Sequence, residues 1–458
     1  MDKTGHASEY AGMKQRTIAL FGAGLLAVVG CSTSSTGDRA PAPRSADVSP
    51  AQPKIPSRTF SLQDFGAVGD GTTLNTDAFK RAVAAVDKAG GGRLVVPAGV
   101  WFTGPIDLCS AIDLHLDAGA TILFSPKFED YGTASRYRLL LQATDAHDVM
   151  ISGAGTINGH GEAWWGAAEK FKVEANAKKA RNNTMPRPNM VGFERCQRVR
   201  VEGVTLTASP KFNLVPSRCQ DVTVEGIAIF NPHKASPNTD GIDPSLCQRV
   251  LISHCLIDTD DDNIAIKSGG PAGEGVSDVL ITDCTFKHGH GCSFGSETSG
   301  GDRRVIVRNC TFEDTDIGVR FKSDRTRGGL VEDIVYEDLT MKNVGQAIVI
   351  TSYYPDRDLP KPGQHVEPKP VGGTTPAWNR ITIRNVTAVG CTKNAGLIMG
   401  LPESPATDIT LDNVTIDAPE GLRIGYAKNV TLKKVRVTAA KGEPLLVEDT
   451  VEGLQRVD

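Results

Sequence analysis

Short segments of alternating apolar and polar residues repeat along most of the chain. Five of them begin with β-branched residues, and their starts lie 23, 28, 29 and 26 residues apart. Alternation over so few residues predicts strands. The period is too short for a propeller blade, and it favours the coil of a solenoid. We therefore expect an all-β protein, a single-stranded right-handed parallel β-helix of about ten coils. The five segments are 199–206, 222–229, 250–257, 279–286 and 305–312.

One stretch of the body has the period of a helix instead. The residues after Asn75 place apolar side chains three and four apart, and Asn75 or Thr76 stands where an N-cap is expected. A helix here would cover the open end of the stack, as terminal repeats of solenoids must. Two longer insertions follow, 164–181 after Trp164 and 353–378 after Tyr353. Each either walls a groove or packs against the outside of the stack.

The N-terminus has the pattern of an export signal. Residues 1–13 are polar, so we take Met13 as the true start; Lys14 and Arg16 then precede an apolar run that is short for a membrane span. The run ends in Val-Val-Gly-Cys31, which resembles a bacterial lipobox and would make Cys31 the lipidated residue. A general secretion signal with an incidental cysteine is the alternative.

The expected domain organisation follows from this. Residues 1–31 form a signal peptide of the lipoprotein type, 32–57 a flexible tether rich in Ser, Pro and Ala, and 58–458 the β-helix. We expect an exported bacterial protein, either anchored to a membrane through a lipid in the periplasm or at the cell surface, or secreted.

Most of the ten cysteines occupy repeating apolar positions. Cysteine at such positions behaves as a small buried hydrophobe, so we expect stacked thiols in preference to disulfides. No Cys-x-x-Cys motif suggests a metal site. The net charge of -4 argues against a nucleic-acid partner. One set comprises Cys255, Cys284 and Cys310, and a second set comprises Cys196, Cys219 and Cys247.

Polar residues gather where four further segments, between residues 238 and 324, align as successive coils. Alignment on Ile242, Ile264, Cys292 and Val319 places Asp240, Asp262 and His290 in one polar column, beside Asp261. Arg320 and Lys322 are two apart and share a strand face. Crowded carboxylates raise one another's pKa, and glycoside hydrolysis needs a protonated and an ionised carboxyl group.

These motifs resemble the signatures of the polygalacturonase family, glycoside hydrolase family 28, and in detail bacterial pectin-degrading endopolygalacturonases. The matching residues are Asn238-Thr-Asp240, Asp261-Asp262, Gly289-His290-Gly291 and Arg320-Phe-Lys322, with Phe321 in place of the usual isoleucine. The resemblance implies inverting, endo-acting hydrolysis of α-1,4-galacturonosyl linkages in pectic polysaccharide. It implies no metal and no organic cofactor, and we expect a monomer.

The resemblance also implies roles for single residues. Asp261 is the expected general acid, Asp240 and Asp262 activate water, and His290 tunes the protonation of the acid. The residues expected to bind substrate are Asn238, Lys267, Arg320, Lys322 and Tyr354. We expect Asp243, Asp258 and Asp260 only to cap backbone amides.

Rival functions share this scaffold. The nearest are exo-action and hydrolysis of rhamnogalacturonan or xylogalacturonan. A second class is a polysaccharide lyase, which would need Ca²⁺ and give unsaturated products. A third is a β-helix that binds surface glycans without cleaving them.

Overall fold

A computed structural model describes residues 48–178, 184–356 and 358–458, all within one compact unit that runs from Ala42 to Asp458. The expected signal peptide, with Met13 and Cys31, and the first part of the expected tether lie outside the described residues. Within the described ranges, no helix is both long enough and apolar enough to span a membrane.

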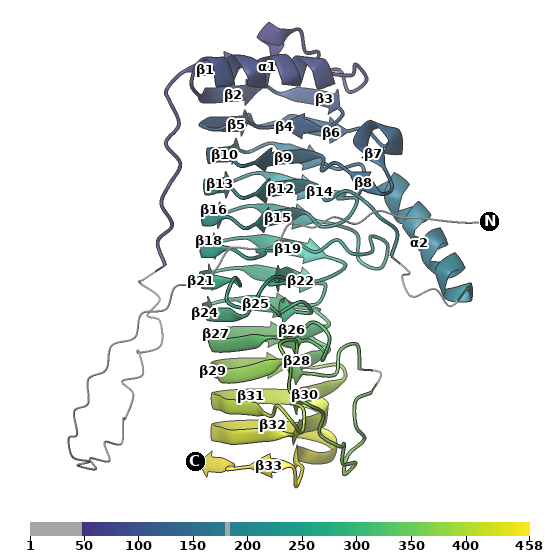
Figure 1. The fold of residues 1–458 in the computed structure, drawn as a ribbon, viewed down its shortest axis with the longest axis vertical. Coiled ribbons are helices and arrows are strands. Elements are labelled where there is room, and N and C mark those ends of the chain that lie inside the picture. The colour runs from purple at the N-terminus through teal and green to yellow at the C-terminus, as the bar shows by residue number, and fades with distance from the viewer. Residues whose placement is uncertain (1–47, 179–183, 357) are drawn as a thin grey trace, which may run out of the picture. The chain divides into compact units, whose positions relative to one another are not determined.

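The strands stack in parallel ladders, as Figure 1 shows, and form a right-handed parallel β-helix. This confirms the expected fold class. From β2 to β32 the first ladder has twelve strands in the described chain, compared with about ten expected. The strands of the first ladder are β1 (Thr59–Ser61), β2 (Gly92–Val96), β5 (Ile112–Leu116), β10 (His147–Gly153), β13 (Gln197–Glu202), β16 (Gln220–Glu225), β18 (Gln248–Ser253), β21 (Ser277–Thr282), β24 (Asp302–Arg308), β27 (Leu330–Lys342), β29 (Ala377–Val389), β31 (Ala406–Gly425) and β32 (Ala427–Val447), followed by the short β33 (Val451–Glu452) and β34 (Gln455–Val457).

Two further ladders complete each coil. The second ladder contains β3 (Gly99–Thr103), β6 (Ala120–Phe124), β11 (Thr156–Asn158), β14 (Thr205–Thr207), β17 (Ala228–Phe230), β19 (Leu256–Thr259), β22 (Thr285–His288) and β25 (Thr311–Glu313). The third ladder contains β4 (Ile106–Asp107), β9 (Leu141–Thr144), β12 (Val191–Glu194), β15 (Leu214–Ser217), β20 (Ile264–Ile266), β23 (Cys292–Gly295), β26 (Ile317–Lys322), β28 (Gln346–Thr351) and β30 (Asn394–Met399).

The third ladder has the register that the sequence predicted. Ile242 bridges to Ile264, which pairs with Cys292, which pairs with Val319. All four are fully buried, because strand side chains alternate and this phase faces the core. Phe294 and Phe321 stack one strand apart at 4.7 Å, so the unusual Phe321 lies in the core.

Helix α1 (Thr76–Lys88) covers the N-terminal end of the stack with buried residues that include Phe79 and Val86. This confirms the expected cap of the solenoid. The start of the helix differs from the expectation. Asn75 occupies the N-cap position, but its side chain makes no hydrogen bond to the first turn of the helix. The Asn75 side chain instead accepts a hydrogen bond from the Val68 amide (2.8 Å) and donates to nearby carbonyls, and it thereby anchors the preceding loop. That loop follows the short 3₁₀ turn η2 (Leu62–Phe65).

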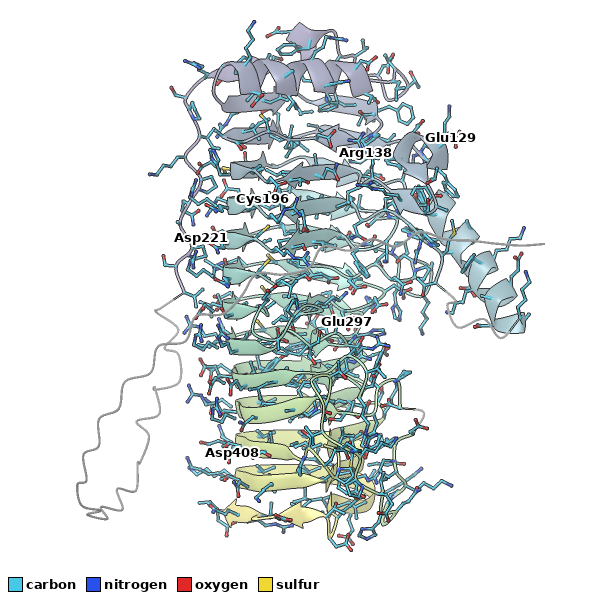
Figure 2. All side chains as sticks on the ribbon, viewed as in Figure 1. Glu129, Arg138, Cys196, Asp221, Glu297 and Asp408 are labelled. Atoms are coloured by element: carbon cyan, nitrogen blue, oxygen red, sulfur yellow. The ribbon has the colours of Figure 1, made fainter. Side chains whose placement is uncertain are left out.

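Residues 48–57, expected to be the end of a flexible tether, lie along the side of the β-helix. Val48 packs against Leu280 and Ile306, and the Lys54 amide donates to Asp148 (2.9 Å). Figure 2 labels Asp221 at the edge of the stack, and its carboxylate accepts from the Ala51 amide (3.1 Å). The backbone of this proline-rich stretch finds its partners in turn aspartates, so the ordered body begins before Arg58.

The first insertion contains helix α2 (Glu162–Ala177), which leaves the stack beside η3 (Phe128–Tyr131) and the hairpin of β7 (Gly132–Thr133) and β8 (Arg136–Tyr137). Trp164 is buried, stacks on Phe128 at 3.9 Å and meets Tyr137 edge-on. Trp165 donates to the Ser209 carbonyl (2.8 Å). The tryptophan pair therefore anchors the helix to the outside of the stack.

The nine cysteines of the described chain are all free thiols, and eight are buried. The Cys196 amide lies 3.4 Å from the Cys219 sulfur, and the Cys219 amide lies 3.4 Å from the Cys247 sulfur. Figure 2 shows Cys196 within the stack. This confirms the expected columns of stacked thiols.

Mild reductant should therefore leave the thermal stability of the protein unchanged, because no bond of the core would be reduced. The measurement is the melting temperature with and without dithiothreitol, together with a peptide map digested without reductant. Disulfide-linked peptides that join Cys255, Cys284 or Cys310 would contradict the prediction.

Candidate active site

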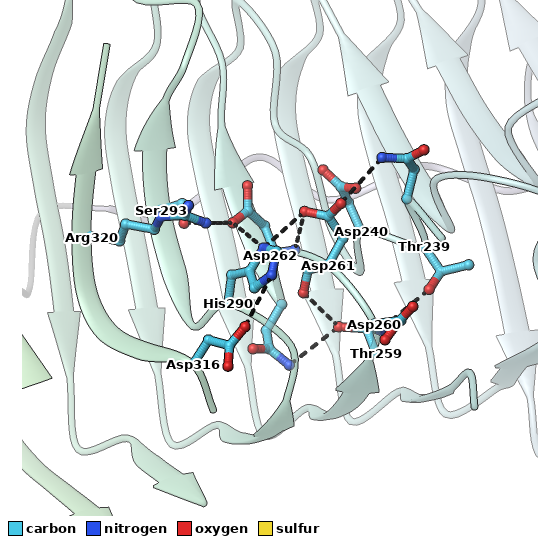
Figure 3. A network of polar contacts seen from close by, with 12 residues as sticks. Thr239, Asp240, Thr259, Asp260, Asp261, Asp262, His290, Ser293, Asp316 and Arg320 are labelled. Carbon is cyan, nitrogen blue, oxygen red and sulfur yellow. Dashed lines mark hydrogen bonds and ion pairs between the residues drawn. The ribbon is translucent and has the colours of Figure 1, made fainter. Parts of the chain in front are cut away.

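Charged side chains converge on the outer face of the third ladder, as Figure 3 shows. Asp240 lies two residues before the bridge at Ile242, and Asp262 two residues before β20. His290 lies two residues before β23. Because these strands are in register on successive coils, the polar side chains before them meet as well. The structure thus brings together the side chains whose convergence the sequence predicted.

Asp262 is held by two cations from β26. Its Oδ1 lies 3.0 Å from Arg320, and its Oδ2 lies 2.6 Å from the Lys322 ammonium; Ser293 also donates to Oδ1 (2.7 Å). Burial alone would raise the pKa of Asp262, but Lys322 and Arg320 hold it below its usual range. Asp262 is therefore ionised at neutral pH, and both of its oxygens are engaged.

Asp261 and His290 form a second pair. His290 Nδ1 lies 3.1 Å from Asp261 Oδ1, and its Nε2 lies 3.3 Å from Asp316 Oδ2. Burial opposes the charge of His290, but hydrogen bonds to the two carboxylates raise its pKa to about 9. Burial likewise opposes the charge of Asp261, and the imidazolium reverses this and lowers the pKa of Asp261. The proton of this pair thus resides on His290 in the free protein.

Asp240 belongs to a third group, built around Lys267. The Lys267 ammonium lies 2.9 Å from Asp240 Oδ2 and 2.6 Å from Asp243 Oδ2, and it sits 4.0 Å from the centre of the Phe212 ring. Burial is the main cause that raises the pKa of Asp240, and it raises the pKa of Asp243 to about 6. One cation thus faces two buried carboxyl groups.

The expectation that Asp243 merely caps a backbone amide is wrong, because Asp243 forms this buried ion pair. Asp258 likewise accepts from His288 Nδ1 (2.7 Å), if that nitrogen carries the proton. Asp260 does accept a hydrogen bond from a backbone amide, that of Lys234, as expected. Lys267, expected to bind substrate, makes its closest described contacts with the two carboxylates.

Comparison with known proteins shows which family of proteins this chain is similar to. Residues 88–441 match the profile of Glycosyl hydrolases family 28. The chain belongs to that family. An Endo-polygalacturonase of Pectobacterium carotovorum subsp. carotovorum is 30% identical over 407 residues, which cover 84% of this chain and 92% of that protein. A Probable polygalacturonase of Vitis vinifera is 34% identical over 385 residues, which cover 79% and 74%. Among solved structures, an exopolygalacturonase from Thermotoga maritima has a TM-score of 0.68 at 30% identity, covering 84% and 94%.

Family 28 membership makes the chain a glycoside hydrolase. A cavity of about 300 Å³ is lined by Asp261 and also by Glu169 and Lys172 of α2. The helix that the tryptophans anchor therefore also walls the groove, so both interpretations of this insertion hold.

Arg187 is a residue of the site that the sequence did not reveal. It is buried, donates to the Pro210 and Pro237 carbonyls (2.9 and 2.8 Å), and donates to Asn238 Oδ1 (2.7 Å). The Asn238 amide in turn donates to Asp261 Oδ2 (3.2 Å). Asn238 therefore orients the expected acid. Arg187 stands outside the four motifs, so only its place in the fold identifies it.

Tyr354 lies where the sequence placed it, beside the cations. Its ring centre is 5.8 Å from the Arg320 guanidinium carbon and 5.4 Å from the Lys322 ammonium. The neighbouring Tyr353 is buried and packs with Leu397, Met399 and Tyr426. Leu359 and Val366 of the second insertion pack against this cluster. Of the two tyrosines, Tyr354 is therefore the one at the site.

Ligand atoms of Asp261, Asp262 and His290 lie within 4.8 Å of one another, a spacing at which three such groups can hold a metal ion. A metal would have to displace the His290 proton and compete with Arg320 and Lys322 for Asp262. The donor set is thus already neutralised by protein cations, which does not favour a resident metal.

The charge of His290 gives a stability prediction. Its pKa in the folded protein is raised to about 9 from an ordinary value near 6.5, so its contribution is fully present below pH 6.5 and is lost as the pH rises through 9. Urea titrations should show that the wild type loses stability relative to His290→Gln between pH 7 and pH 9. Parallel curves for the two proteins would contradict the protonated pair.

Proposed function

We propose that this family 28 hydrolase cleaves α-1,4-galacturonosyl linkages of polygalacturonate by a single, inverting displacement. The observation that carries the proposal is the pair of neighbouring cations, Arg320 and Lys322, that meet Asp262 beside Asp261 and His290. A uronate chain carries a carboxylate on every sugar. Arg offers that carboxylate a planar fork and Lys a point charge.

The proton path follows from the contacts. The His290 imidazolium donates to Asp261, and Asp261 protonates the glycosidic oxygen as the bond to the anomeric carbon breaks. The proton on Nδ1 is in place to reload the carboxylate, so Asp261 acts as an acid although its pKa is low in the free protein. Entry of the substrate excludes water from Asp261 and favours its neutral form.

A water molecule must attack the opposite face of the sugar. Asp240 Oδ1 has no hydrogen-bond partner among the described residues, so in the ionised form that Lys267 favours it can accept a proton from that water. Asp262, which is ionised, assists from the same side. Both Asp262 oxygens are occupied by donors, which makes it a poor nucleophile, and the arrangement therefore supports inversion.

We propose endo-action, because a cavity lies on each side of the catalytic cluster. One side has the cavity of about 300 Å³ beneath α2, and the other has a cavity of about 460 Å³ that begins at Gln346 and Val349. Relatives named for both modes exist, an Endo-polygalacturonase and an exopolygalacturonase. Space for sugars on either side fits internal cleavage of the chain.

A single digestion of polygalacturonate tests the proposal. Early mixed oligomers would support endo-action, while monomer or dimer alone from the start would show exo-action. Proton NMR of the first products gives the anomer and thereby the stereochemistry. Products that absorb in the ultraviolet would reveal a lyase, and an absence of new reducing ends would leave only glycan binding.

Removing one cation should weaken productive binding of de-esterified substrate. Lys322→Ala or Arg320→Ala is expected to cost about 2 to 5 kcal/mol in kcat/KM, as for truncated buried charge pairs. Methyl esterification removes the partner charge. The preference for polygalacturonate over highly esterified pectin should therefore shrink in either variant, and an unchanged preference would contradict the assignment of these cations to substrate.

We also propose that the protein is exported, acts as a monomer and is anchored through a lipid on Cys31. The support is the apolar run before Val-Val-Gly-Cys31. Labelling with a fatty-acid analogue in a bacterial host tests the anchor. Label on the wild type but not on Cys31→Ala supports it, and release of an unlabelled soluble protein supports secretion instead.

A further inference from the structure

The floor of the groove changes character one strand beyond the catalytic cations. Arg320 of β26 pairs in register with Val349 of β28, which pairs with Leu397 of β30, which pairs with Arg423 of β31. The next residue of this outward column is Leu446. The column that carries Arg320 at the catalytic centre thus continues as two aliphatic side chains before the next cation.

These side chains line the cavity of about 460 Å³. Leu359 and Pro362 of the second insertion also line it, so the cavity has apolar groups on its floor and on its wall. Leu446, at its far end, is 37% exposed. Gln346 and Asn394 add an amide pair, joined by a hydrogen bond of 2.8 Å, that can meet sugar hydroxyl groups.

The charges around the cavity oppose an anion. Arg423 donates to Glu448 through Nε (2.7 Å), and this contact neutralises the cation of the outward column. Among the described lining residues, Asp356, Glu420 and Glu443 outnumber Lys441, the cation that remains once Arg423 is paired with Glu448. A uronate carboxylate bound here would be repelled by the acidic neighbours and would lose its hydration against apolar carbon. A neutral group would carry neither of these free-energy costs.

The cavity lies beside the catalytic cations. Val349 lies one strand from Arg320, and Asp356 follows Tyr354, whose ring lies beside both catalytic cations. Adjacent strands lie about 4.8 Å apart. A chain whose galacturonate carboxylate meets Arg320 and Lys322 therefore places its next units on this side over Val349 and Leu397.

We propose that this cavity is a subsite for a methyl-esterified galacturonate unit. The proposal rests on the proposed hydrolysis of galacturonan and names the substrate that suits it best. The catalytic centre takes a free carboxylate, and the neighbouring subsite takes a methyl ester, whose methyl group packs on Val349, Leu397 and Leu446. The preferred substrate is thus a partly esterified pectin.

The test compares wild-type cleavage of fully de-esterified polygalacturonate with cleavage of randomly, partly methyl-esterified pectin, and maps the esters in the products by mass spectrometry. We expect products enriched in an ester at a fixed position, one or two units from the new chain end on one side of the cut. A random ester distribution would overturn the subsite. If polygalacturonate is not cleaved at all, the proposed hydrolysis itself fails.

Two variants change the chemistry of the subsite. Leu446→Lys places a cation over its floor and should lower the ratio of activity on esterified pectin to activity on polygalacturonate about three- to fivefold, the size of one partly exposed charge contact. Glu443→Lys, at an exposed position, should shift the ratio in the same direction without touching the apolar floor.

Val457→Lys is the matched control, since Val457 is 45% exposed and lines a different surface. Circular dichroism verifies the fold of each variant. A ratio that stays at the wild-type value in both Leu446→Lys and Glu443→Lys, or falls equally in Val457→Lys, would overturn the proposal. A change in the activity ratio that is seen only with rhamnose-containing chains would also overturn the proposal, because the occupant of the cavity would then be a deoxysugar.

Discussion

Asp261→Asn is expected to reduce hydrolysis of polygalacturonate by about 10² to 10⁴-fold, the usual loss when a general acid is removed. The amide has nearly the shape of the carboxyl group, and its oxygen can still accept from His290, although its NH2 group then faces the Asn238 amide and that one contact is lost. Folding and substrate binding should persist. What it lacks is a proton to give to the leaving oxygen. Steady-state kinetics with a reducing-end assay measures the loss, which should fall on kcat more than on KM.

The leaving group distinguishes Asp261 from the other carboxylates. An aryl galacturonide that releases a stable phenolate needs no acid, so Asp261→Asn should recover much of its rate on that substrate. Asp240→Asn and Asp262→Asn should remain inactive, because they lose the water-activating groups. Asp283→Asn is a matched control, since Asp283 lies in a turn and bonds Thr282 and Asn309. Similar residual rates for Asp261→Asn on both substrates would contradict the role of acid.

The register of the third ladder explains why so much of the site was predictable. In a parallel β-helix each coil repeats the geometry of the last, so aligning Ile242, Ile264, Cys292 and Val319 in the sequence also aligns them in space. Residues at a fixed offset from such a column must meet. Asp240, Asp262 and His290 were found this way, and their convergence needed no knowledge of any loop.

Contacts that depend on the path of a side chain were not predictable. Asp243 lies one residue beyond Ile242 and resembles the many turn aspartates of the chain, yet its carboxylate meets Lys267 from the next coil. The carboxyl groups whose pKa rises are Asp240 and Asp243, whereas the expected acid, Asp261, has its pKa lowered by His290. Crowding predicts that pKa values separate, but the placement of each cation decides which carboxyl group is protonated.

Lys267→Met is expected to destabilise the protein by about 3 to 5 kcal/mol at pH 8, because removal of one partner from a buried ion pair leaves an uncompensated charge. Here two carboxyl groups, Asp240 and Asp243, lose their common cation. Methionine keeps the length of the side chain and its packing on Phe212, so the loss reports the charge. Urea titration followed by tryptophan fluorescence measures it. Lys287→Met, which removes a partly exposed pair with Glu313, should cost under about 1 kcal/mol.

The pH dependence of that loss identifies its cause. In the folded wild type the pKa of Asp243 is already raised to about 6, above its unfolded value, so Asp243 favours the folded state more as the pH falls from above 6 toward 4. Without Lys267 both carboxyl groups bind protons more tightly still. The penalty of Lys267→Met should therefore shrink between pH 8 and pH 5, and Asp243→Asn added to it should restore part of the stability at pH 8. A penalty that is independent of pH and unaffected by Asp243→Asn would contradict the role of Lys267 as the counter-ion that holds Asp240 in place for the attacking water.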